Sequence, residues 1–363
     1  MEARLAPVIK LLESCNLACT YCYQEELLAK RRVMGEATLD RILSELARVR
    51  TSPLQILWYG GEPTMVGYDA FSRAVDLANL RLAGGGLRHA LQTNATLIDD
   101  RWAALLARER FMVTVSLDGF GELHDLHRKT VRGDGSHASV VSGVRALLKA
   151  GVRPRASCVV TPETLPHAER LVEYFAELGL AEADFPPAQR YVGGEFKVYV
   201  EPRAYGEFMA RVLDRWLALG RKDFRIRSLA GLARAIAGSP PSFCKLEAGC
   251  AQYVTFSWDG RVYPCDEFVG QPEHELGHVM EQPLDAILGS PRVQELQKAW
   301  AVTPSECLAC EWVNVCRGGC PFERRLNGGV DRRSVMCEGL KVTYQRMADH
   351  LGTSARVPAP ALV

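Results

Sequence analysis

The sequence predicts an α/β protein in which a parallel sheet closes into a partial (β/α)6 TIM-like barrel. Strand-like apolar runs alternate with helical patterns over residues 1–190. Most of the runs are continuously apolar, which is typical of parallel strands that are covered on both faces. Polar motifs follow four of the runs, at the end where barrels of this kind bind their ligands.

Six apolar runs are predicted as strands, the last more weakly than the others: residues 5–13, 54–60, 88–94, 111–119, 153–161 and 182–188. Five stretches between them have the apolar spacing of amphipathic helices: residues 35–49, 68–80, 98–109, 136–151 and 165–179. Strand–helix–strand connections of this kind are right-handed, and a succession of them closes readily into a full or partial barrel.

Four strand ends carry distinctive residues: ESCN after the first strand, YGGEP after the second, QTNAT after the third and SLDG after the fourth. Glycine and asparagine also form ordinary turns, so each motif by itself has a structural explanation. Because the carboxyl ends of barrel strands converge on one mouth, four such motifs in succession favour a ligand site there.

The composition is that of an ordinary globular protein. Of its 363 residues, 47% are hydrophobic and 24% are charged, and the formal net charge is +1. This balance gives no reason to expect nucleic acid or an anionic membrane as a partner. No apolar run approaches a membrane span and the N-terminus lacks the features of a signal peptide, so a cytoplasmic protein is expected.

Twelve cysteines are many for such a chain, and most of them are clustered. Three lie between residues 15 and 22, one is Cys158, and eight lie between residues 244 and 337. In a reducing compartment clustered thiols hold metal more often than they form disulfides, and disulfide scaffolds are usually short, secreted chains. Cys158 lies inside an apolar strand and is expected to be a small buried hydrophobic residue.

The first group has the spacing C-x3-C-x2-C and consists of Cys15, Cys19 and Cys22. A closed structural zinc site uses four protein ligands, and the next cysteine or histidine along the chain is His89. Three thiolates leave one coordination position open, as catalysis requires. The stretch CNLACTYCY resembles the signature of radical S-adenosylmethionine (SAM) enzymes. The resemblance implies a [4Fe-4S] cluster on these three cysteines, with SAM bound to the fourth iron.

Further motifs are similar to those of the same family. The GGEP sequence resembles the motif that meets the methionine amino group of SAM, and glycine there lets the backbone approach a ligand. SLDG resembles the segment that contacts the methionine carboxylate and the ribose. The residues that this resemblance places at SAM are Tyr21, Gly60, Gly61, Glu62, Pro63, Thr93, Asn94, Ser116, Asp118 and Arg128. For Arg128, an exposed position in the basic segment RKTVR is the alternative.

The second group of cysteines resembles the seven-cysteine SPASM pattern, with Gly260 at the expected place and Cys244 as an eighth thiolate. Eight thiolates match the needs of two fully ligated [4Fe-4S] clusters. The family connectivity implies one auxiliary cluster on Cys244, Cys250, Cys265 and Cys320 and another on Cys307, Cys310, Cys316 and Cys337. One or two zinc ribbons are the alternative, because C-x2-C is also a common zinc half-site.

The segment YVTFSWDGRVYPCDEF predicts two strands joined by an Asp-Gly turn, with Asp266 directly after Cys265. In the anaerobic sulfatase-maturating enzymes, which are SPASM proteins, the acidic residue at this position is the proposed catalytic base. The resemblance implies that Asp266 accepts a proton from the substrate. A carboxylate that caps backbone amides or pairs with arginine is the alternative.

Two positions differ from those maturases. The maturases carry Gln immediately before GGEP, where this chain has Tyr59. They carry Tyr two residues after the third signature cysteine, where this chain has Gln24 preceded by Tyr23. Because those positions help to hold the sulfatase Cys or Ser, the differences argue against formylglycine formation.

The expected organisation has four parts: a SAM-binding partial barrel at residues 1–190, a helical bridging segment at 191–243, a SPASM domain of β-hairpin and short helices at 244–340, and a C-terminal helix with a flexible tail at 341–363. The cluster motif starts at Cys15, so a leader-binding domain before it is not expected, although many peptide-modifying relatives have one.

The resemblance implies a radical SAM oxidoreductase of the peptide maturase type, with three [4Fe-4S] clusters and with ferredoxin or flavodoxin as reductant. A 5′-deoxyadenosyl radical would abstract hydrogen, so that a side chain of a ribosomally made peptide or protein is oxidised or cross-linked. The alternatives are a small-molecule radical dehydrogenase or epimerase and a sulfatase formylglycine maturase. From another class, the alternative is a non-catalytic Fe–S electron carrier or zinc scaffold.

Overall fold

The computed structural model describes residues 5–49, 53–192, 194–240, 243–247, 250 and 253–352. They fall into two compact units. Unit 1 comprises the described residues of Met1–Ala156 and Ala251–Glu295, and unit 2 those of Ser157–Cys250 and Leu296–Val363. The predicted flexible tail lies outside the described residues.

Unit 1 is built on a mainly parallel sheet with the strand order β6-β5-β4-β1-β12-β13-β14. The first four predicted strands are found in it as β1 (Ala6–Lys10), β4 (Gln55–Tyr59), β5 (Arg88–Thr93) and β6 (Met112–Ser116). Lys10 lies opposite Tyr59, and Thr93 lies opposite Val115. This register brings the polar residues after these strands to the same edge of the sheet.

The C-terminal hairpin extends the sheet of unit 1. β12 (Tyr253–Phe256) pairs in parallel with β1, and β13 (Arg261–Tyr263) and β14 (Gly277–His278) follow in antiparallel order. The predicted Asp-Gly turn joins β12 to β13, where Gly260 has a φ of +98°, a backbone conformation that favours glycine. The hairpin confirms the sequence prediction, whereas its pairing with the first strand was not predicted.

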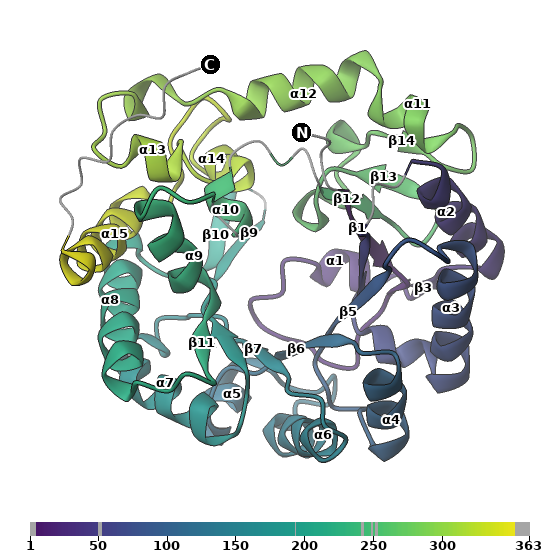
Figure 1. Ribbon diagram of the computed structural model, residues 1–363, viewed down its shortest axis with the longest axis horizontal. Helices are drawn as coiled ribbons and strands as arrows, with labels where there is room; N and C mark the ends of the chain where they lie inside the picture. The colour runs from purple at the N-terminus through teal and green to yellow at the C-terminus, as the bar shows by residue number, and fades with distance from the viewer. Residues whose placement is uncertain are drawn as a thin grey trace. The chain divides into compact units, whose positions relative to one another are not determined.

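Amphipathic helices follow the strands of unit 1 and pack along them (Figure 1). The four long ones are α2 (Glu36–Val49), α3 (Tyr68–Arg81), α4 (Asp100–Arg108) and α6 (His137–Lys149). Ile42, Val75, Leu106 and Val144 are fully buried on their apolar faces. The shorter elements are β2 (Leu12–Glu13), α1 (Glu25–Leu28), β3 (Arg32–Val33), α5 (Gly121–His127), α11 (Leu284–Leu288) and the 3-10 turns η1 (Pro63–Val66), η3 (Asp266–Phe268) and η4 (Pro272–His274).

Unit 2 contains the end of β7 (Arg155–Ser157) and all of β8 (Glu182–Asp184), which lie within the last two predicted strands. β11 (Arg225–Ile226) pairs in parallel with β8. A separate antiparallel hairpin of β9 (Gln189–Val192) and β10 (Glu195–Tyr199) follows β8 along the chain. The sequence did not predict this hairpin.

Helices make up most of the rest of unit 2. They are α7 (Ala168–Glu177), which follows the 3-10 turn η2 (Leu165–His167), and α8 (Pro202–Leu219), α9 (Arg227–Ile236), α10 (Cys244–Glu247), α13 (Val313–Cys316), α14 (Pro321–Leu326) and α15 (Cys337–Leu351), with η5 (Ser305–Cys307) before α13. α12 (Pro291–Ala301) spans the division between the units. None of the helices in the described ranges is both long and apolar enough to cross a membrane.

Candidate active site

The cysteine loop of unit 1 begins directly after β2. Cys15, Cys19 and Cys22 are half-buried, and the cysteines of the chain form no disulfide bonds. Burial raises the pKa of Cys15 to about 12 and the pKa of Cys19 to about 11. Without a metal these thiols are therefore protonated at neutral pH, and a metal centre that binds to them would displace their protons.

Three donors point at the sulfur atoms of this loop. Cys15 Sγ accepts from Leu17 N at 3.4 Å and from Asn94 Nδ2 at 3.8 Å. Cys19 Sγ accepts from Arg128 Nη1 at 3.9 Å. Hydrogen bonds to sulfur stabilise thiolate ligands and tune the metal centre that they hold. The chemistry of the loop and its surroundings thus fits a thiolate-bound iron–sulfur cluster.

Glu62 of the GGEP motif connects the second and third strand ends. Its carboxylate is fully buried, and Oε1 accepts from Thr64 N at 3.0 Å and from Thr93 Oγ1 at 2.7 Å. Oε2 accepts from Asn94 N at 2.6 Å. Burial raises the pKa of Glu62, and these hydrogen bonds oppose the rise. Oε1 also accepts from Thr64 Oγ1 at 2.7 Å, which gives it three donors, whereas Asn94 N is the donor to Oε2. Oε2 is therefore the oxygen better able to accept from a further donor such as an ammonium group.

The GGEP loop packs directly on the start of the cysteine loop. Gly61 N donates to Leu12 O at 3.1 Å, and Glu62 N donates to Ser14 O at 2.9 Å. A Cβ atom at Gly61 would lie 2.0 Å from Ser14 O, so glycine is required for this approach. Pro63 is buried and starts the 3-10 turn that follows Glu62.

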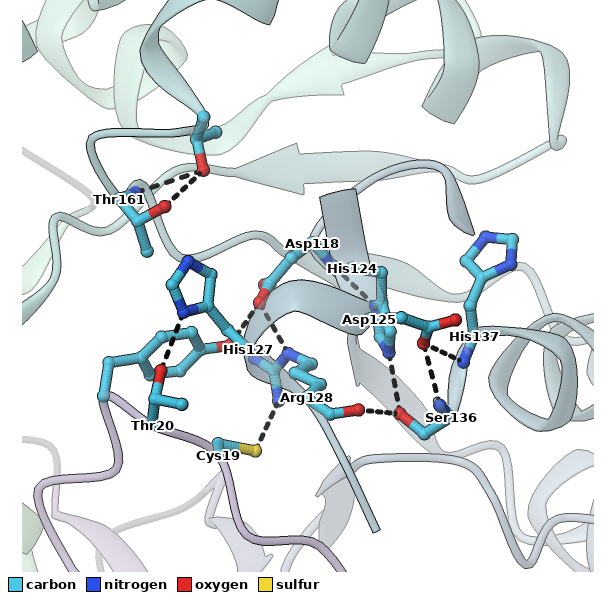
Figure 2. A network of polar contacts seen from close by, with 12 residues as sticks. Cys19, Thr20, Asp118, His124, Asp125, His127, Arg128, Ser136, His137 and Thr161 are labelled. Atoms are coloured by element: carbon cyan, nitrogen blue, oxygen red, sulfur yellow. Dashed lines mark hydrogen bonds and ion pairs between the residues drawn. The ribbon is translucent and has the colours of Figure 1, made fainter. Parts of the chain in front are cut away.

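Asp118 and Arg128 form a buried ion pair beside Cys19 (Figure 2). Arg128 Nε donates to Asp118 Oδ2 at 2.8 Å, and Tyr21 Oη donates to the same oxygen. Both members of the pair are almost completely buried, so the exposed position considered for Arg128 is wrong. Ser116 ends β6 half-buried, two residues before Asp118.

Two polar residues that the sequence did not point to support this ion pair. His124 Nδ1 accepts from Asp118 N at 3.1 Å, and His124 Nε2 lies 3.0 Å from Ser136 Oγ (Figure 2). Ser136 Oγ donates to Arg128 O at 2.5 Å. Burial lowers the pKa of His124 to about 4, so the ring is neutral and its Nε2 carries the proton. In the sequence, His124 is marked only by its place four residues before Arg128.

Asp266 lies beside the cysteine loop, 243 residues away from Tyr23 along the chain. Tyr23 Oη donates to Asp266 Oδ2 at 2.7 Å and lies 3.0 Å from Tyr59 Oη. Gln24 Nε2 donates to Tyr23 Oη at 2.9 Å. Gln24 and Tyr59 distinguish this chain from the sulfatase-maturating enzymes. Both therefore contact Tyr23, the tyrosine that is hydrogen-bonded to Asp266.

In unit 2, the four cysteines predicted for the second auxiliary cluster line one cavity: Cys307, Cys310, Cys316 and Cys337. Burial raises the pKa of the Cys316 thiol to about 12. Arg333, which also lines the cavity, donates from Nη1 to Cys337 Sγ at 3.9 Å. A cavity bounded by four thiols and a cationic donor fits a thiolate-ligated cluster.

The predicted ligands of the first auxiliary cluster belong to different units. Cys244, Cys250 and Cys320 lie in unit 2, and Cys265 lies in unit 1, so their grouping stays a prediction. Cys158 is fully buried, as expected. No three His, Cys, Asp or Glu side chains in the described part of the chain are grouped closely enough to hold a single metal ion.

Comparison with known proteins finds sulfatase-maturating enzymes. The serine-type anaerobic sulfatase-maturating enzyme of Bacteroides thetaiotaomicron is 28% identical over 93% of this chain and 87% of its own length. The cysteine-type enzyme of Clostridium perfringens is 29% identical over 84% of this chain and 85% of its own length.

Two solved structures are similar in fold. The native sulfatase-maturating enzyme anSMEcpe with bound AdoMet and Cp18Cys peptide has a TM-score of 0.87 at 26% identity, with 96% of this chain and 98% of that chain covered. Streptococcus suis SuiB bound to the precursor peptide SuiA has a TM-score of 0.69 at 18% identity, with 92% and 75% covered, and shares the fold.

Two family models match the chain. The radical SAM superfamily matches residues 9–175, and the SPASM iron–sulfur cluster-binding domain matches residues 248–317. The first range contains the cysteine loop, the GGEP loop and the Asp118–Arg128 pair, and the second contains the hairpin that carries Asp266. The chain therefore carries a radical SAM domain and a C-terminal SPASM domain.

Proposed function

We propose that this chain oxidises a side chain of a peptide or protein, with the cysteine or serine of a sulfatase as the first candidate substrate. The sulfatase-maturating enzymes are similar to it over most of both chains, and one of them was solved with a bound peptide. The observation that carries the proposal is Asp266 in unit 1, hydrogen-bonded to Tyr23, which directly follows the last cysteine of the loop.

SAM and [4Fe-4S] clusters are the cofactors of this family. When bound, they supply the acceptors of one hydrogen atom and one electron from the substrate. Cys15, Cys19 and Cys22 would hold the SAM-binding cluster, with Asn94 and Arg128 as donors to their sulfur atoms.

Further residues are proposed to contact SAM or to hold the auxiliary clusters. Glu62 has an acceptor for the SAM ammonium group. The auxiliary clusters would be held by the two sets of four cysteines that the SPASM pattern assigns: Cys244, Cys250, Cys265 and Cys320, and Cys307, Cys310, Cys316 and Cys337.

Asp266 is proposed to accept the substrate proton. Oxidation of a CH2–OH or CH2–SH group to C=O or C=S removes one hydrogen atom from carbon, one proton from oxygen or sulfur, and one electron. Water then converts the C=S group to C=O and releases hydrogen sulfide, so both substrates end as the aldehyde. The hydrogen atom and the electron leave to the cofactors, so the protein has to provide a base for the proton. A carboxylate in hydrogen-bonding reach of the substrate can do this.

Gln24 and Tyr59 weaken the sequence argument against a sulfatase substrate. The maturases carry tyrosine at the position of Gln24 and glutamine at the position of Tyr59, so the same two chemical groups are present at exchanged positions. Amide and phenol groups both donate and accept hydrogen bonds. Both groups contact Tyr23, the donor to Asp266, in this chain.

The test is an anaerobic reconstitution followed by turnover with SAM, reduced flavodoxin and three synthetic sulfatase peptides. The peptides differ only in having Cys, Ser or Ala at the modified position. We expect about twelve irons per chain, 5′-deoxyadenosine formation, and a hydrazine-reactive aldehyde in the Cys or the Ser peptide but not in the Ala peptide. Formation of 5′-deoxyadenosine with all peptides unchanged would exclude the sulfatase substrate, and its absence would contradict the enzymatic activity.

A further inference from the structure

Lys10, the last residue of β1, is a charged group without a role in the reaction described above. Its side chain is fully buried, and its ammonium donates to Gln24 Oε1 at 3.0 Å. Burial lowers the pKa of Lys10, and the charges of Asp266 and Glu13 oppose this change. Because a buried ammonium group destabilises a protein unless it is compensated, its position requires an explanation.

A chain of hydrogen bonds leads from Lys10 to Asp266. Beyond the Lys10 contact, Gln24 Nε2 donates to Tyr23 Oη at 2.9 Å, and Tyr23 Oη donates to Asp266 Oδ2 at 2.7 Å. Gln24 is buried, whereas Tyr23 is 41% exposed. Asp266 is half-buried, so the chain of hydrogen bonds runs from the interior of unit 1 to a partly accessible carboxylate.

Lys10 sets the direction of these hydrogen bonds. An ammonium group only donates, so the Gln24 oxygen has to face Lys10 and the Gln24 NH2 group has to face Tyr23. Tyr23 Oη then accepts from Gln24 and points its own proton at Asp266. Tyr59 Oη, 3.0 Å from Tyr23 Oη, is left to donate to it.

We propose that Lys10 is a positioning residue for Asp266 that acts through Gln24 and Tyr23; the inference rests on the proposed function. The hydrogen bond from Tyr23 holds Asp266 Oδ2. Asp266 Oδ1 lies 3.4 Å from Cys265 Sγ, and a cysteine that ligates a cluster has no S–H proton to donate. Through the hydrogen bond from Tyr23, Lys10 fixes the orientation in which the Asp266 carboxylate meets the hydroxyl or thiol proton of the substrate.

Loss of the ammonium group removes this constraint. The Gln24 amide can then rotate by half a turn, so that its oxygen accepts the Tyr23 proton and Asp266 loses its donor. Glutamate at position 24 has the shape of glutamine but only acceptor oxygens. Gln24→Glu is therefore expected to take the Tyr23 proton in the same way while its contact with Lys10 is kept.

The test compares the wild type with Lys10→Met, Gln24→Glu and Lys10→Arg as reconstituted holoenzymes acting on the sulfatase Cys peptide. We expect Lys10→Met and Gln24→Glu to lower the ratio of aldehyde to 5′-deoxyadenosine about tenfold. Lys10→Met should leave the iron content and the 5′-deoxyadenosine formed without peptide unchanged. Lys10→Arg keeps a donor and is expected to restore part of the ratio. An unchanged ratio, or a loss of product matched by an equal loss of iron and 5′-deoxyadenosine, would overturn the inference.

Crystal structures of the wild type and Lys10→Met separate this inference from the proposed function, because they require no turnover. The hydrogen bond from Tyr23 to Asp266 is expected in the wild type and should be absent in Lys10→Met. If the wild type leaves the peptide unmodified but the variant loses this bond, the proposed function fails and the positioning role is supported. If the variant keeps the bond, the positioning role is wrong.

Discussion

Buried charges in unit 1 are compensated by specific partners. Arg128 and Asp118 neutralise each other beside Cys19. Glu62 accepts hydrogen bonds from Thr93 Oγ1 and from the backbone N–H of Asn94. Removal of one member of a buried pair leaves an uncompensated charge, at a cost of about 3–5 kcal/mol. These residues therefore stabilise the loops around the cysteines as well as being placed to contact a bound cofactor.

Asp266→Asn is expected to lower aldehyde formation about 100-fold, because the amide cannot accept the substrate proton. Asparagine keeps an oxygen for the hydrogen bond from Tyr23, so iron content and 5′-deoxyadenosine formation should not change. The measurement is the aldehyde yield per 5′-deoxyadenosine with the sulfatase Cys peptide. Glu267→Gln, one residue further along, is the matched control, and equal yields from the two variants would exclude Asp266 as the base.

His89 is expected to make the protein less stable in mild acid. It stacks on Phe111 and accepts a hydrogen bond from Trp58 Nε1 at 3.0 Å. Burial lowers the pKa of His89 to about 4, whereas a histidine in an unfolded chain titrates near 6.5. As the pH falls through about 6.5, the unfolded state takes up a proton and the folded state does not, so the free energy of unfolding decreases by up to about 3 kcal/mol at pH 4.

Thermal unfolding midpoints at about pH 7, 6 and 5 measure this effect. His89→Gln removes one titrating group but keeps an acceptor for Trp58 and is expected to reduce the pH dependence. His124, whose pKa is also lowered by burial to about 4, accounts for part of the remaining dependence. The same loss of stability in the variant and the wild type would show that His89 is not responsible.

Among the elements, the β12–β13 hairpin brings the candidate base to the cysteine loop. β12 pairs in parallel with β1, which is followed by the short strand β2 and then by the cysteine loop. Asp266 follows β13 after a short connection and starts the turn η3. A hairpin that is distant in sequence is thus tied by backbone hydrogen bonds to the strand whose end carries the cysteines.

No side chain is expected to fit at the point where Gly206 of α8 meets Gly339 of α15. A Cβ atom at Gly206 would lie 2.3 Å from Gly339 O. Gly206→Ala should therefore force the helices apart, destabilise unit 2 by about 1–3 kcal/mol and lower the thermal midpoint. Because α15 begins with Cys337, iron held by the second auxiliary set should be lost as well.

Thermal unfolding and iron analysis of Gly206→Ala test this prediction. Gly35→Ala is the matched control, since a Cβ atom there has no neighbour within 4 Å. Equal midpoints and equal iron content in the two variants would show that the helix crossing does not limit stability.

At the scale of the whole chain, the three cysteine sets are expected to hold their clusters independently. Replacement of Cys15, Cys19 and Cys22 by Ala should leave about eight irons and abolish 5′-deoxyadenosine formation. Replacement of the four cysteines around the unit 2 cavity, Cys307, Cys310, Cys316 and Cys337, should also leave about eight irons but retain 5′-deoxyadenosine formation without peptide.

Iron analysis and the 5′-deoxyadenosine assay distinguish these outcomes. Cys158→Ala is the control, because this buried thiol lies outside all three sets, and its iron content should equal that of the wild type. Cleavage of SAM by the variant without Cys15, Cys19 and Cys22 would contradict the assignment of the first set.

Much of the candidate site was predictable because its signals are local. The spacing of Cys15, Cys19 and Cys22 and the GGEP sequence lie within short loops, and the strands before them are rich in apolar residues. The support of Arg128 by His124 and Ser136 was not predictable, because a single histidine or serine in a helical or loop segment has many ordinary uses.

The sequence by itself determined the alternation of strands and helices, the thiol sets and the family, because periodicity and ligand spacing depend on neighbours along the chain. Only the tertiary structure decided that β12 pairs with β1, that Arg128 is buried against Asp118, and that Tyr23 meets Asp266. The first and third contacts join residues far apart in sequence and form because packing of the sheet brings distant strand ends together. Arg128 lies only ten residues after Asp118, but its burial depends on how α5 and the cysteine loop pack around it. Local sequence patterns do not specify how the strands pack in the sheet.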